Sequence, residues 1–423
     1  MTVSFLYKKR RRINMWTVAV KNKVILAKNI IEAWNQSLRL VLKNGEIIWD
    51  KNEKLLEVFN VNLIIKKPGR NKNLLKPYFK EFGLDPFERI QKLFEDSRVK
   101  NKELKISYAQ RIYKYRGKNQ LEKIIQKLKV NPYSKSATFT LFDPIADEKH
   151  VPCIAILDFK IRHKKLFLTV FARSSDATKK LPADLFALTK IQKQVASSLR
   201  IKTGVLTMFI ASLHVYERDF DALYRVVTRW RWNRKATTWD EETQDPGHYV
   251  NIENGYQRFL MFLEDCLGEI KAENILDVAC GTGAVASFLF KKAKKIYGID
   301  LAPQMIKVAK QKNPQINFKV GDALDLPYKD SFFDVVVSRG VLISHLLKGS
   351  KKKLIKEYSR VIKPGGFLIF DFLQNISSEE SIEKEKAILN KEKIKKFLLG
   401  VGFKILAFES KTETRVNSVC AKK

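Results

Sequence analysis

Residues 151–186 read VPCIAILDFKIRHKKLFLTVFARSSDATKKLPADLF, and this stretch decides the fold of the amino-terminal part of the chain. Alternating apolar and polar residues at Ile154–Phe159 and Leu166–Phe171 predict two neighbouring strands of one sheet. Cys153 would then stand at the start of the first strand, facing Arg173 from the next. This places a nucleophile beside a positive charge, which favours the thiolate form.

Three short motifs follow in the same region. They are Arg173-Ser174-Ser175-Asp176, Leu181-Pro182-Ala183-Asp184, which we expect in a proline-containing loop, and His214-Val215-Tyr216. Apolar residues at Gly204–Leu213 predict a strand that delivers the last motif. Residues two apart on a strand face the same side, so His214 and Tyr216 can bond one ligand.

The composition is that of a folded protein long enough for two or three domains. The 423 residues are 45% hydrophobic, and Lys plus Arg outnumber Asp plus Glu by 80 to 45, giving a net charge of +35. The excess is spread along the chain, which favours a solvated lysine-rich surface over nucleic-acid binding. We interpret the one dense basic run, Lys8–Arg12, as an exposed arm.

The cysteines are far apart in the sequence and form no Cys-x-x-Cys pair, which argues against a disulfide framework and against structural zinc. We therefore expect a cytoplasmic protein without a metal. No apolar run is long enough to cross a bilayer, and the start of the chain lacks a signal-peptide core, so no membrane partner is expected. The cysteines are Cys153, Cys266, Cys280 and Cys420.

Before this region the chain predicts scaffold elements. Strand-like groups at Lys23–Leu26 and Val61–Ile65 flank a helix near Ile30–Val41, and Asn44-Gly45 is typical of a hairpin turn. An amphipathic pattern predicts a helix at Leu84–Phe94.

Two further helices are predicted at Gln120–Leu128 and Leu185–Ser198. The composition turns polar after Arg231, and we place the domain boundary near Arg234, which divides the chain into residues 1–234 and 235–423.

Together these motifs resemble the thymidylate synthase and pyrimidine hydroxymethylase family, over about Tyr108–Asp219 and in its short archaeal-type form. The resemblance implies a mixed-sheet α+β domain that forms a homodimer. It also implies a pyrimidine nucleotide substrate and 5,10-methylenetetrahydrofolate or a related pterin as one-carbon donor. In such enzymes a thiolate adds to C6 of the base, which makes C5 nucleophilic.

The resemblance implies roles for individual residues. Cys153 would be the nucleophile, whereas alone it would be read as a structural cysteine. His214 and Tyr216 would hold the sugar hydroxyl. The remaining implied catalytic residues are Tyr108, Asp176 and Asp184, and the remaining substrate-binding residues are Arg173, Ser174 and Lys135.

Three positions depart from the family pattern. Lys135 and Ser136 stand where the family carries two arginines that reach the phosphate of the other subunit, and lysine supplies a point charge where arginine supplies a two-pronged donor. Ala109 follows Tyr108 where glycine is common. For the family's active-site glutamate, Glu57 is a candidate whose sequence context does not match well.

Asp184 stands where thymidylate synthases have asparagine. An asparagine amide pairs with O4 and N3–H of uracil, whereas cytosine presents an amino donor and an acceptor at N3. A carboxyl group suits that reversed pattern better when it carries a proton. The resemblance thus favours a cytosine nucleotide that is hydroxymethylated, with dUMP to dTMP next. The alternative is that Asp184 is a surface loop carboxylate in a diverged synthase.

The second half of the chain predicts strands alternating with helices. Ile275–Ala279 runs into Cys280-Gly281-Thr282-Gly283, after an amphipathic helix at Gly255–Leu267. Such alternation predicts a doubly wound α/β sheet. The further predicted strands are Lys295–Ile299, one reaching Val320, Asp334–Ser338, Phe367–Phe372 and a closing antiparallel pair, Phe403–Phe408 and Arg415–Cys420. Ser377–Lys396 reads as a charged helix.

The glycine-rich turn is accompanied by Asp300 after the second predicted strand, Asp322 after the third, and Pro364-Gly365-Gly366 before the fifth strand. Together these features resemble class I S-adenosylmethionine-dependent methyltransferases. The resemblance implies that Asp300 accepts from both ribose hydroxyls and that Asp322 bonds the adenine amino group. The other implied cofactor-binding residues are Asp277, Ala279, Gly281, Gly283, Leu301, Ala323 and Ser338. The methyl acceptor stays open, with His345 as either a base or a structural residue.

The sequence therefore predicts a bifunctional one-carbon transferase, with a synthase-like domain followed by a Rossmann-like methyltransferase domain. The alternative is a nucleic-acid or small-molecule methyltransferase whose first domain is an inactive scaffold.

Overall fold

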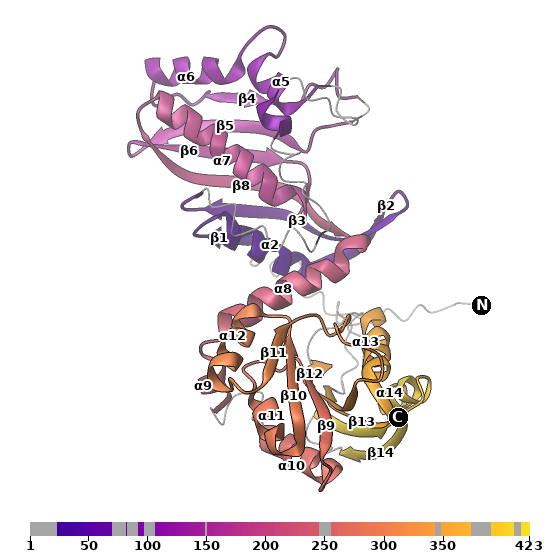
Figure 1. Ribbon diagram of the computed structural model, residues 1–423. Helices are drawn as coiled ribbons and strands as arrows, with labels where there is room; N and C mark the ends of the chain where they lie inside the picture. Colours follow the sequence, from indigo (N-terminus) through magenta and orange to yellow (C-terminus); the bar gives the residue numbers. More distant parts are fainter. Residues whose placement is uncertain are drawn as a thin grey trace, which may run out of the picture. The chain divides into compact units, whose positions relative to one another are not determined.

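A computed structural model describes residues 23–69, 82, 92–96, 106–148, 150–244, 255–342, 348–373, 391–409 and 416–423 (Figure 1). The chain divides into two compact units, Met1–Leu223 and Tyr224–Lys423. Of the predicted features, Lys8–Arg12, His345 and most of Leu84–Phe94 and Ser377–Lys396 lie outside the described residues. No helix in the described part is long and apolar enough to span a membrane.

The amino-terminal unit is built on one mixed sheet with the order β1-β3-β8-β6-β5-β4. The β1/β3 and β6/β8 pairs are parallel and the other pairs along this path are antiparallel. The predicted strands and the mixed sheet are confirmed. In the order of the sheet the strands are β1 (Val24–Ala27), β3 (Glu53–Ile65), β8 (Lys202–Tyr216), β6 (Lys165–Ala172), β5 (Ile154–Arg162) and β4 (Thr138–Thr140); β2 (Glu46–Asp50) pairs with β3, and β7 (Ser175–Asp176) with β8.

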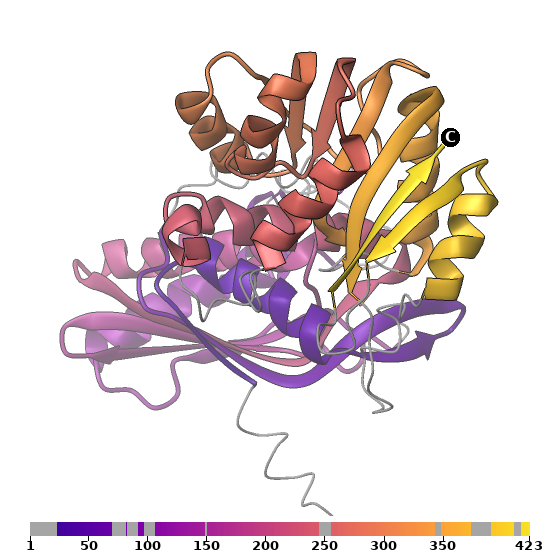
Figure 2. The same ribbon diagram turned by 90° about the horizontal axis from the view of Figure 1, so that it is seen from below.

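Two long helices, α2 (Ile30–Asn44) and α7 (Lys180–Ser198), contact each other and pack on the same face of this sheet (Figure 2). Trp34 on α2 is fully buried, and its indole N–H donates to the Ala177 carbonyl just before α7, at 2.7 Å. This contact fixes α2 against the start of α7, where the candidate site lies. Two shorter helices, α5 (Tyr108–Tyr113) and α6 (Gln120–Val130), precede β4.

Asn44-Gly45 does not form the predicted hairpin turn. Asn44 ends α2, and the Gly45 N–H donates to the Val41 carbonyl at 2.8 Å. A Cβ at Gly45 would lie 2.5 Å from that carbonyl oxygen, so the glycine permits a close helix end rather than a hairpin. The hairpin turn joins β2 to β3, with Lys51 at φ 56°.

The Leu181-Pro182-Ala183-Asp184 segment is also not the predicted loop. It forms the first turn of α7, which begins at Lys180. Proline is compatible with a first turn because the N–H that it lacks has no partner within the helix there. The prediction failed because proline signals both loops and helix starts.

The carboxy-terminal unit has a seven-stranded sheet with the order β11-β10-β9-β12-β13-β15-β14. The first five strands are parallel and β15 is antiparallel to both neighbours, which confirms the predicted doubly wound sheet and its closing pair. The strands, in the order of the sheet, are β11 (Asn317–Val320), β10 (Ala293–Asp300), β9 (Ala272–Val278), β12 (Phe333–Leu342), β13 (Ile362–Leu373), β15 (Val416–Lys422) and β14 (Lys404–Glu409).

Helices cover both faces of this second sheet. On one face α10 (Gly255–Leu267) contacts β13 and β15, while α13 (Lys348–Val361) and α14 (Lys391–Leu399) pack on the core of the other face. The sheet order reverses between β9 and β12, and ligands of such sheets bind beyond the carboxyl ends of the strands at that point. The remaining helices include α8 (Phe220–Lys235), α9 (Trp239–Gln244), α11 (Ala284–Phe288) and α12 (Pro303–Lys312).

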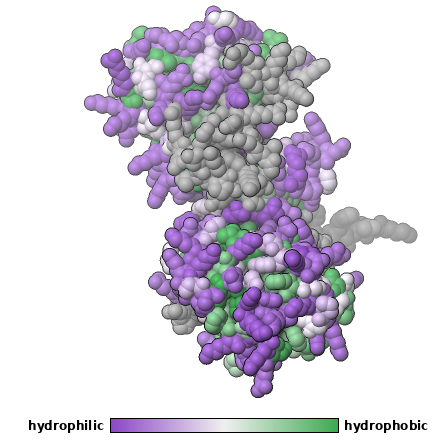
Figure 3. Space-filling model, in the orientation of Figure 1, coloured by the Kyte–Doolittle hydropathy of each residue, from purple (hydrophilic) through white to green (hydrophobic). Residues whose placement is uncertain are grey.

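The surface drawn in Figure 3 is mainly hydrophilic over the described residues of both units. This agrees with the interpretation of the lysine excess as a solvated surface, since hydrophilic residues cover most of the coloured part of the face shown.

A buried ion pair ties α5 to the turn after β4. Arg111 donates to both carboxylate oxygens of Asp147, at 2.7 and 2.5 Å, and also to the Leu141 and Ile106 carbonyls. The two side chains are 1% and 3% exposed. Because water cannot replace either partner, loss of one leaves a buried charge without compensation.

We expect Arg111→Met to lower the free energy of unfolding of the amino-terminal unit by about 3–5 kcal/mol, because Asp147 would stay buried and charged. The matched control is Arg116→Met, which removes an arginine that pairs with Asp143 at 2.9 Å but is itself 70% exposed. It should cost only about 0–1 kcal/mol. Urea denaturation of both variants measures the difference, and equal losses would contradict a structural role for the buried pair.

Candidate functional site

Cys153 lies immediately before β5 and is half-buried. The Ser174 hydroxyl donates to its sulfur at 3.5 Å, and the Arg173 backbone N–H donates to its carbonyl at 2.8 Å. The Arg-Ser motif at the end of β6 therefore holds Cys153 through its backbone carbonyl and through its sulfur.

Arg173 does not direct its guanidinium at the thiol. Its Nε and Nη2 donate to the Val151 carbonyl at 3.0 and 2.6 Å, and Nη1 donates to the Ser174 hydroxyl at 3.2 Å. The side chain is exposed. Such an arginine is oriented by the chain just before Cys153 and is accessible to an anion from solvent.

Tyr108 begins α5 and borders the thiol from the other side. Its hydroxyl accepts from the Ile154 backbone N–H at 3.1 Å, and its ring stacks on Phe94 with centroids 4.5 Å apart. Burial raises the pKa of its phenol, and the charges of Cys153 and Asp184 raise it further. Tyr108 thus stays protonated between the thiol and the Asp184 carboxyl.

Asp184 is 6% exposed, which excludes the alternative of a surface loop carboxylate. Burial raises the pKa of its carboxyl to about 7, Lys180 lowers it, and Asp176 raises it. Within the described residues, no hydrogen bond or ion pair holds this carboxyl. Burial thus favours the protonated carboxyl, which can donate a hydrogen bond to a ligand.

Asp176 lies on the short strand β7, directly opposite His214 of β8. One carboxylate oxygen accepts from the Thr178 N–H at 2.9 Å, from the Thr178 hydroxyl at 2.6 Å and from the Lys179 N–H at 3.4 Å. Asp176 thereby shapes the turn into α7 and brings negative charge beside both His214 and Asp184.

His214 and Tyr216 lie on the same side of β8, with ring centroids 5.1 Å apart. The Ser212 hydroxyl is 3.4 Å from Nδ1 of His214 and donates to Glu57, which faces His214 across the β3/β8 pairing. Burial lowers the pKa of His214, against the raising charges of Asp176 and Glu57. The ring is thus held as a neutral imidazole near neutral pH.

Lys135 stands apart from this group. It is exposed on the turn between α6 and β4, where Lys127 donates to the Ser136 carbonyl and hydroxyl. The structure thus brings together Cys153, Tyr108, Ser174 and Arg173 at the ends of β5 and β6, and links them through Asp184 and Asp176 to His214 and Tyr216. Lys135 is the predicted residue that this group leaves out.

Sequence reasoning missed Ser212, although the alternation that linked His214 to Tyr216 also places Ser212 on that side. Glu57 was a weak candidate, because its place opposite His214 depends on the register of two strands distant in sequence. A register of this kind has no local signal.

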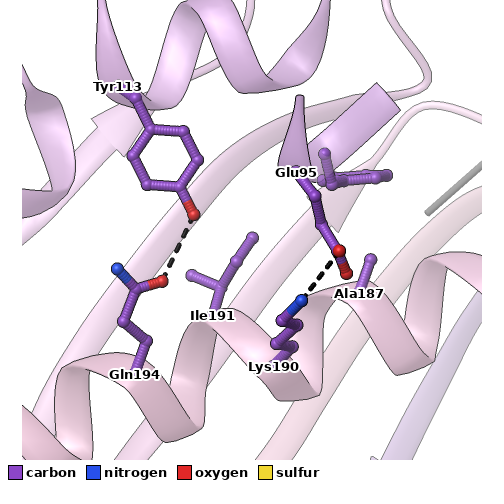
Figure 4. Close-up of a pocket in the computed structure, with 7 residues that line it drawn as sticks. Glu95, Tyr113, Ala187, Lys190, Ile191 and Gln194 are labelled. Atoms are coloured by element: carbon purple, nitrogen blue, oxygen red, sulfur yellow. Dashed lines mark hydrogen bonds and ion pairs between the residues drawn. The ribbon is translucent and has the colours of Figure 1, made fainter. Parts of the chain in front are cut away.

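A separate cavity of about 220 Å³ lies against the exposed side of α7 and takes in none of the predicted site residues (Figure 4). Lys190 pairs with Glu95 across it at 2.7 Å, and the Tyr113 hydroxyl donates to Gln194 at 3.2 Å. The four polar side chains of this cavity are thus paired with one another.

In the carboxy-terminal unit, the turn after β9 has three left-handed residues, Ala279 at φ 59°, Gly281 at φ 53° and Gly283 at φ 88°. A Cβ at Gly283 would lie 2.8 Å from the Phe318 ring, so glycine lets this turn pack on β11. The turn brings backbone N–H groups to the carboxyl end of β9.

Two predicted carboxylates border that turn. Asp300 accepts from the Gly281 and Ala302 N–H groups at 3.0 and 2.8 Å, and burial raises its pKa to about 6. Asp277 is 1% exposed, and its Oδ2 has no hydrogen-bond partner among the described residues. Burial raises the pKa of Asp277 to about 7.

The other predicted cofactor residues flank the same edge. Asp322 accepts from the Leu324 N–H at 2.9 Å and lies 3.9 Å from Arg225 of α8, and Leu301 and Ala323 are half-buried. Ser338 is 2% exposed and its hydroxyl accepts from Tyr358 at 2.7 Å. This edge fits S-adenosylmethionine. Asp300 at the end of β10 suits the ribose hydroxyls, and the unpartnered Asp277 oxygen beside the glycine turn suits the methionine part.

Two groups near this edge were not predicted. Arg339 lies over the Tyr256 ring at 4.8 Å and 3.9 Å from the buried Asp371, whose pKa burial raises to about 6. From α9, Asp240 accepts from the Thr282 hydroxyl at 2.6 Å. Neither group has a local sequence signal, because both depend on contacts between distant segments.

Comparisons with known proteins show two families in the chain. The family profile named thymidylate synthase matches residues 16–246, and one named methyltransferase domain matches residues 276–370. A Methanosarcina mazei protein named "Putative thymidylate synthase" is 32% identical over 209 residues, which are 48% of this chain and 94% of that protein.

Two further similarities are to methyltransferases. Demethylmenaquinone methyltransferase of Renibacterium salmoninarum is 35% identical over 115 residues, 27% of this chain and 46% of that protein. The crystal structure of the N-methyltransferase NodS of Bradyrhizobium japonicum with S-adenosyl-L-homocysteine is 17% identical, covers 46% of this chain and 98% of its own, and has a TM-score of 0.38. Since the first profile spans more than half of its length, the chain belongs to the thymidylate synthase family, and its second half adds a methyltransferase domain.

Proposed function

We propose that the amino-terminal unit transfers a one-carbon group to C5 of a pyrimidine nucleotide, with a cytosine nucleotide preferred and dUMP next. The support is that six predicted residues from separate segments, Cys153, Ser174, Tyr108, Asp184, Asp176 and His214, lie in one connected group.

The chemistry begins with the thiolate of Cys153, which adds to C6 of the base and makes C5 nucleophilic. Arg173, exposed and held by the Val151 carbonyl, is placed to bind the nucleotide phosphate. His214 and Tyr216 hold the sugar. A methylenetetrahydrofolate-type donor would supply the one-carbon unit when bound. Loss of the C5 proton, addition of water to the transferred carbon and cleavage of the C6–S bond would then release Cys153 and a hydroxymethylated cytosine nucleotide.

The observation that carries the cytosine assignment is the burial of the Asp184 carboxyl, which favours its protonated form. With its pKa raised to about 7 by burial, the carboxyl is largely protonated below neutral pH. A protonated carboxyl donates to N3 of cytosine and accepts from the C4 amino group. An ionised carboxylate has no proton to donate to N3, so turnover of the cytosine nucleotide should decline as Asp184 ionises.

Exposed apolar side chains on the sheet of the amino-terminal unit support the proposal of a homodimer. Apolar side chains are exposed on the face opposite α2 and α7, and Phe171 stacks there on Phe209 with centroids 5.5 Å apart. Exposed apolar residues on one face typically mark an interface. They are Val24, Leu26, Phe59, Ile156 and Phe171, between 38% and 57% exposed.

For the carboxy-terminal unit we propose methyl transfer from S-adenosylmethionine. Asp300 has accepted two backbone N–H groups and keeps lone pairs for the ribose hydroxyls, since a carboxylate offers about four acceptor positions. Asp322 would bond the adenine amino group, and the Asp277 and Gly281 edge would hold the methionine part. The cofactor supplies an electrophilic methyl group when bound.

Release of tritium from C5-labelled dCMP, CMP and dUMP, with methylenetetrahydrofolate, tests the first activity. We expect faster release from a cytosine nucleotide, a loss on the order of 10⁴-fold or more in Cys153→Ala, and a decline above about pH 7 as Asp184 ionises. Asp184→Asn should lower kcat/KM for the cytosine nucleotide by about 10- to 100-fold and remove that decline. Turnover of dUMP alone, yielding dTMP, would refute the cytosine assignment.

Sedimentation velocity of the full chain tests the dimer. Phe171→Glu places a charge on the exposed sheet face and should convert the dimer to monomer, because an unpaired charge is costly to bury. Val130→Glu is the control, since Val130 is 87% exposed at the end of α6. A wild-type monomer at micromolar concentration would exclude the proposed dimer.

Calorimetric titration with S-adenosylmethionine tests the second site. Asp300→Ala should weaken binding by about 10- to 100-fold, because the ribose hydroxyls lose a charged acceptor. Wild-type binding should weaken below about pH 6 as Asp300 gains a proton. Asp330→Ala, at a 76% exposed carboxylate, is the control, and equal affinity in the two variants would contradict the assignment.

A further inference from the structure

Three side chains from β3 and β8 form a chain of polar contacts behind the sugar-binding position. Glu57 is 8% exposed and His214 is 9% exposed, and the two residues are paired directly across the strands. Ser212 lies between them, with its hydroxyl donating to Glu57 and lying 3.4 Å from Nδ1 of His214.

The single proton of the Ser212 hydroxyl fixes the direction of this chain. A hydroxyl has one proton and two lone pairs, so once its proton is donated to Glu57 the oxygen can only accept from the ring. This arrangement favours the imidazole proton on Nδ1. The Ser212 backbone carbonyl is a second acceptor for the ring and raises the pKa of His214, so the Ser212→Val variant separates the hydroxyl from the carbonyl.

The imidazole stays neutral despite two nearby carboxylates. Burial lowers the pKa of His214, while Asp176 on β7, Glu57 on β3 and the Ser212 backbone raise it and Lys180 on α7 lowers it. Glu57 Oε2 has no hydrogen-bond partner among the described residues, so Oε1 and its contact with Ser212 hold that side chain.

We infer that Glu57 and Ser212 are positioning residues that hold His214 as its Nδ1–H tautomer, leaving Nε2 to accept a hydrogen bond from the ligand. A neutral nitrogen with a lone pair selects a donor, such as a sugar hydroxyl, and disfavours an ether or fluorine at that position. This selection of a free hydroxyl rests on the proposed nucleotide function, whereas the tautomer itself does not.

Nitrogen-15 NMR of the full chain, with labelled histidine, tests the tautomer without any ligand. The chain has only five histidines, and His214→Gln identifies the signal of His214 by its loss. Near pH 8 we expect the proton on Nδ1 and the chemical shift of a bare nitrogen at Nε2. A proton on Nε2, or a charged ring, would overturn the inference.

Ser212→Thr and Ser212→Val give side chains of nearly equal shape, so they separate the hydrogen bond of the hydroxyl from the packing of the side chain. Ser212→Thr keeps the hydroxyl, and Ser212→Val removes it with nearly the same volume, and both residues suit a strand. Thr should keep the Nδ1–H signal, whereas Val should shift the proton toward Nε2. An unchanged tautomer in Ser212→Val would refute the role of Ser212, and the wild-type spectrum tests the tautomer even if that variant fails to fold.

Binding of nucleotides with and without the sugar hydroxyl tests the ligand. Removal of the hydroxyl, using 3′-deoxy nucleoside monophosphates as probes, should weaken binding about tenfold in the wild type and in Ser212→Thr, and no more than about twofold in Ser212→Val. An equal penalty in all three proteins would refute the hydroxyl selection. Absence of any nucleotide binding would refute the proposed function, while the NMR result would still decide the tautomer.

Discussion

The antiparallel pairing of β3 with β8 is the constraint on which the amino-terminal site depends. It runs from Leu55 opposite Tyr216 to Ile65 opposite Leu206. A shift of one residue would turn Glu57 to the other face of the sheet, away from Ser212 and His214. The same strand β8 pairs with β6 and β7, so the register also fixes His214 beside Asp176 and near the end of β6 that carries Arg173 and Ser174.

Both units hold carboxyl groups in surroundings that oppose their ionisation. Burial raises the pKa of Asp184 and Asp277 to about 7, and of Asp300 and Asp371 to about 6. In the unfolded chain these groups ionise near pH 4, so the folded state holds more protons between about pH 4 and 7. Stability therefore falls as pH rises through that range. Ligands that bond these carboxyls offset this loss.

Much of the fold could be predicted because its signals are local. Alternation gave β5, β6 and β8, and the glycine turn after β9 together with alternating helices gave the doubly wound sheet. Proline and glycine were ambiguous: Gly45 ends a helix instead of turning a hairpin, and Pro182 lies in the first turn of α7. The short motifs made Cys153, Asp184 and His214 candidates, but contacts between distant segments, such as Glu57 with Ser212, have no local signal in the sequence.

Residues 224–246 belong both to the synthase profile and to the second compact unit. The synthase profile ends at residue 246, yet the compact unit that contains the second sheet begins at Tyr224. Within this overlap, Asp240 accepts from Thr282 of the glycine turn, and Trp239 packs with Met305 and Ala302 of the methyltransferase fold. A truncation at residue 246, chosen to isolate the synthase profile, would therefore remove Trp239 and Asp240 from the packing around the glycine turn of the second unit.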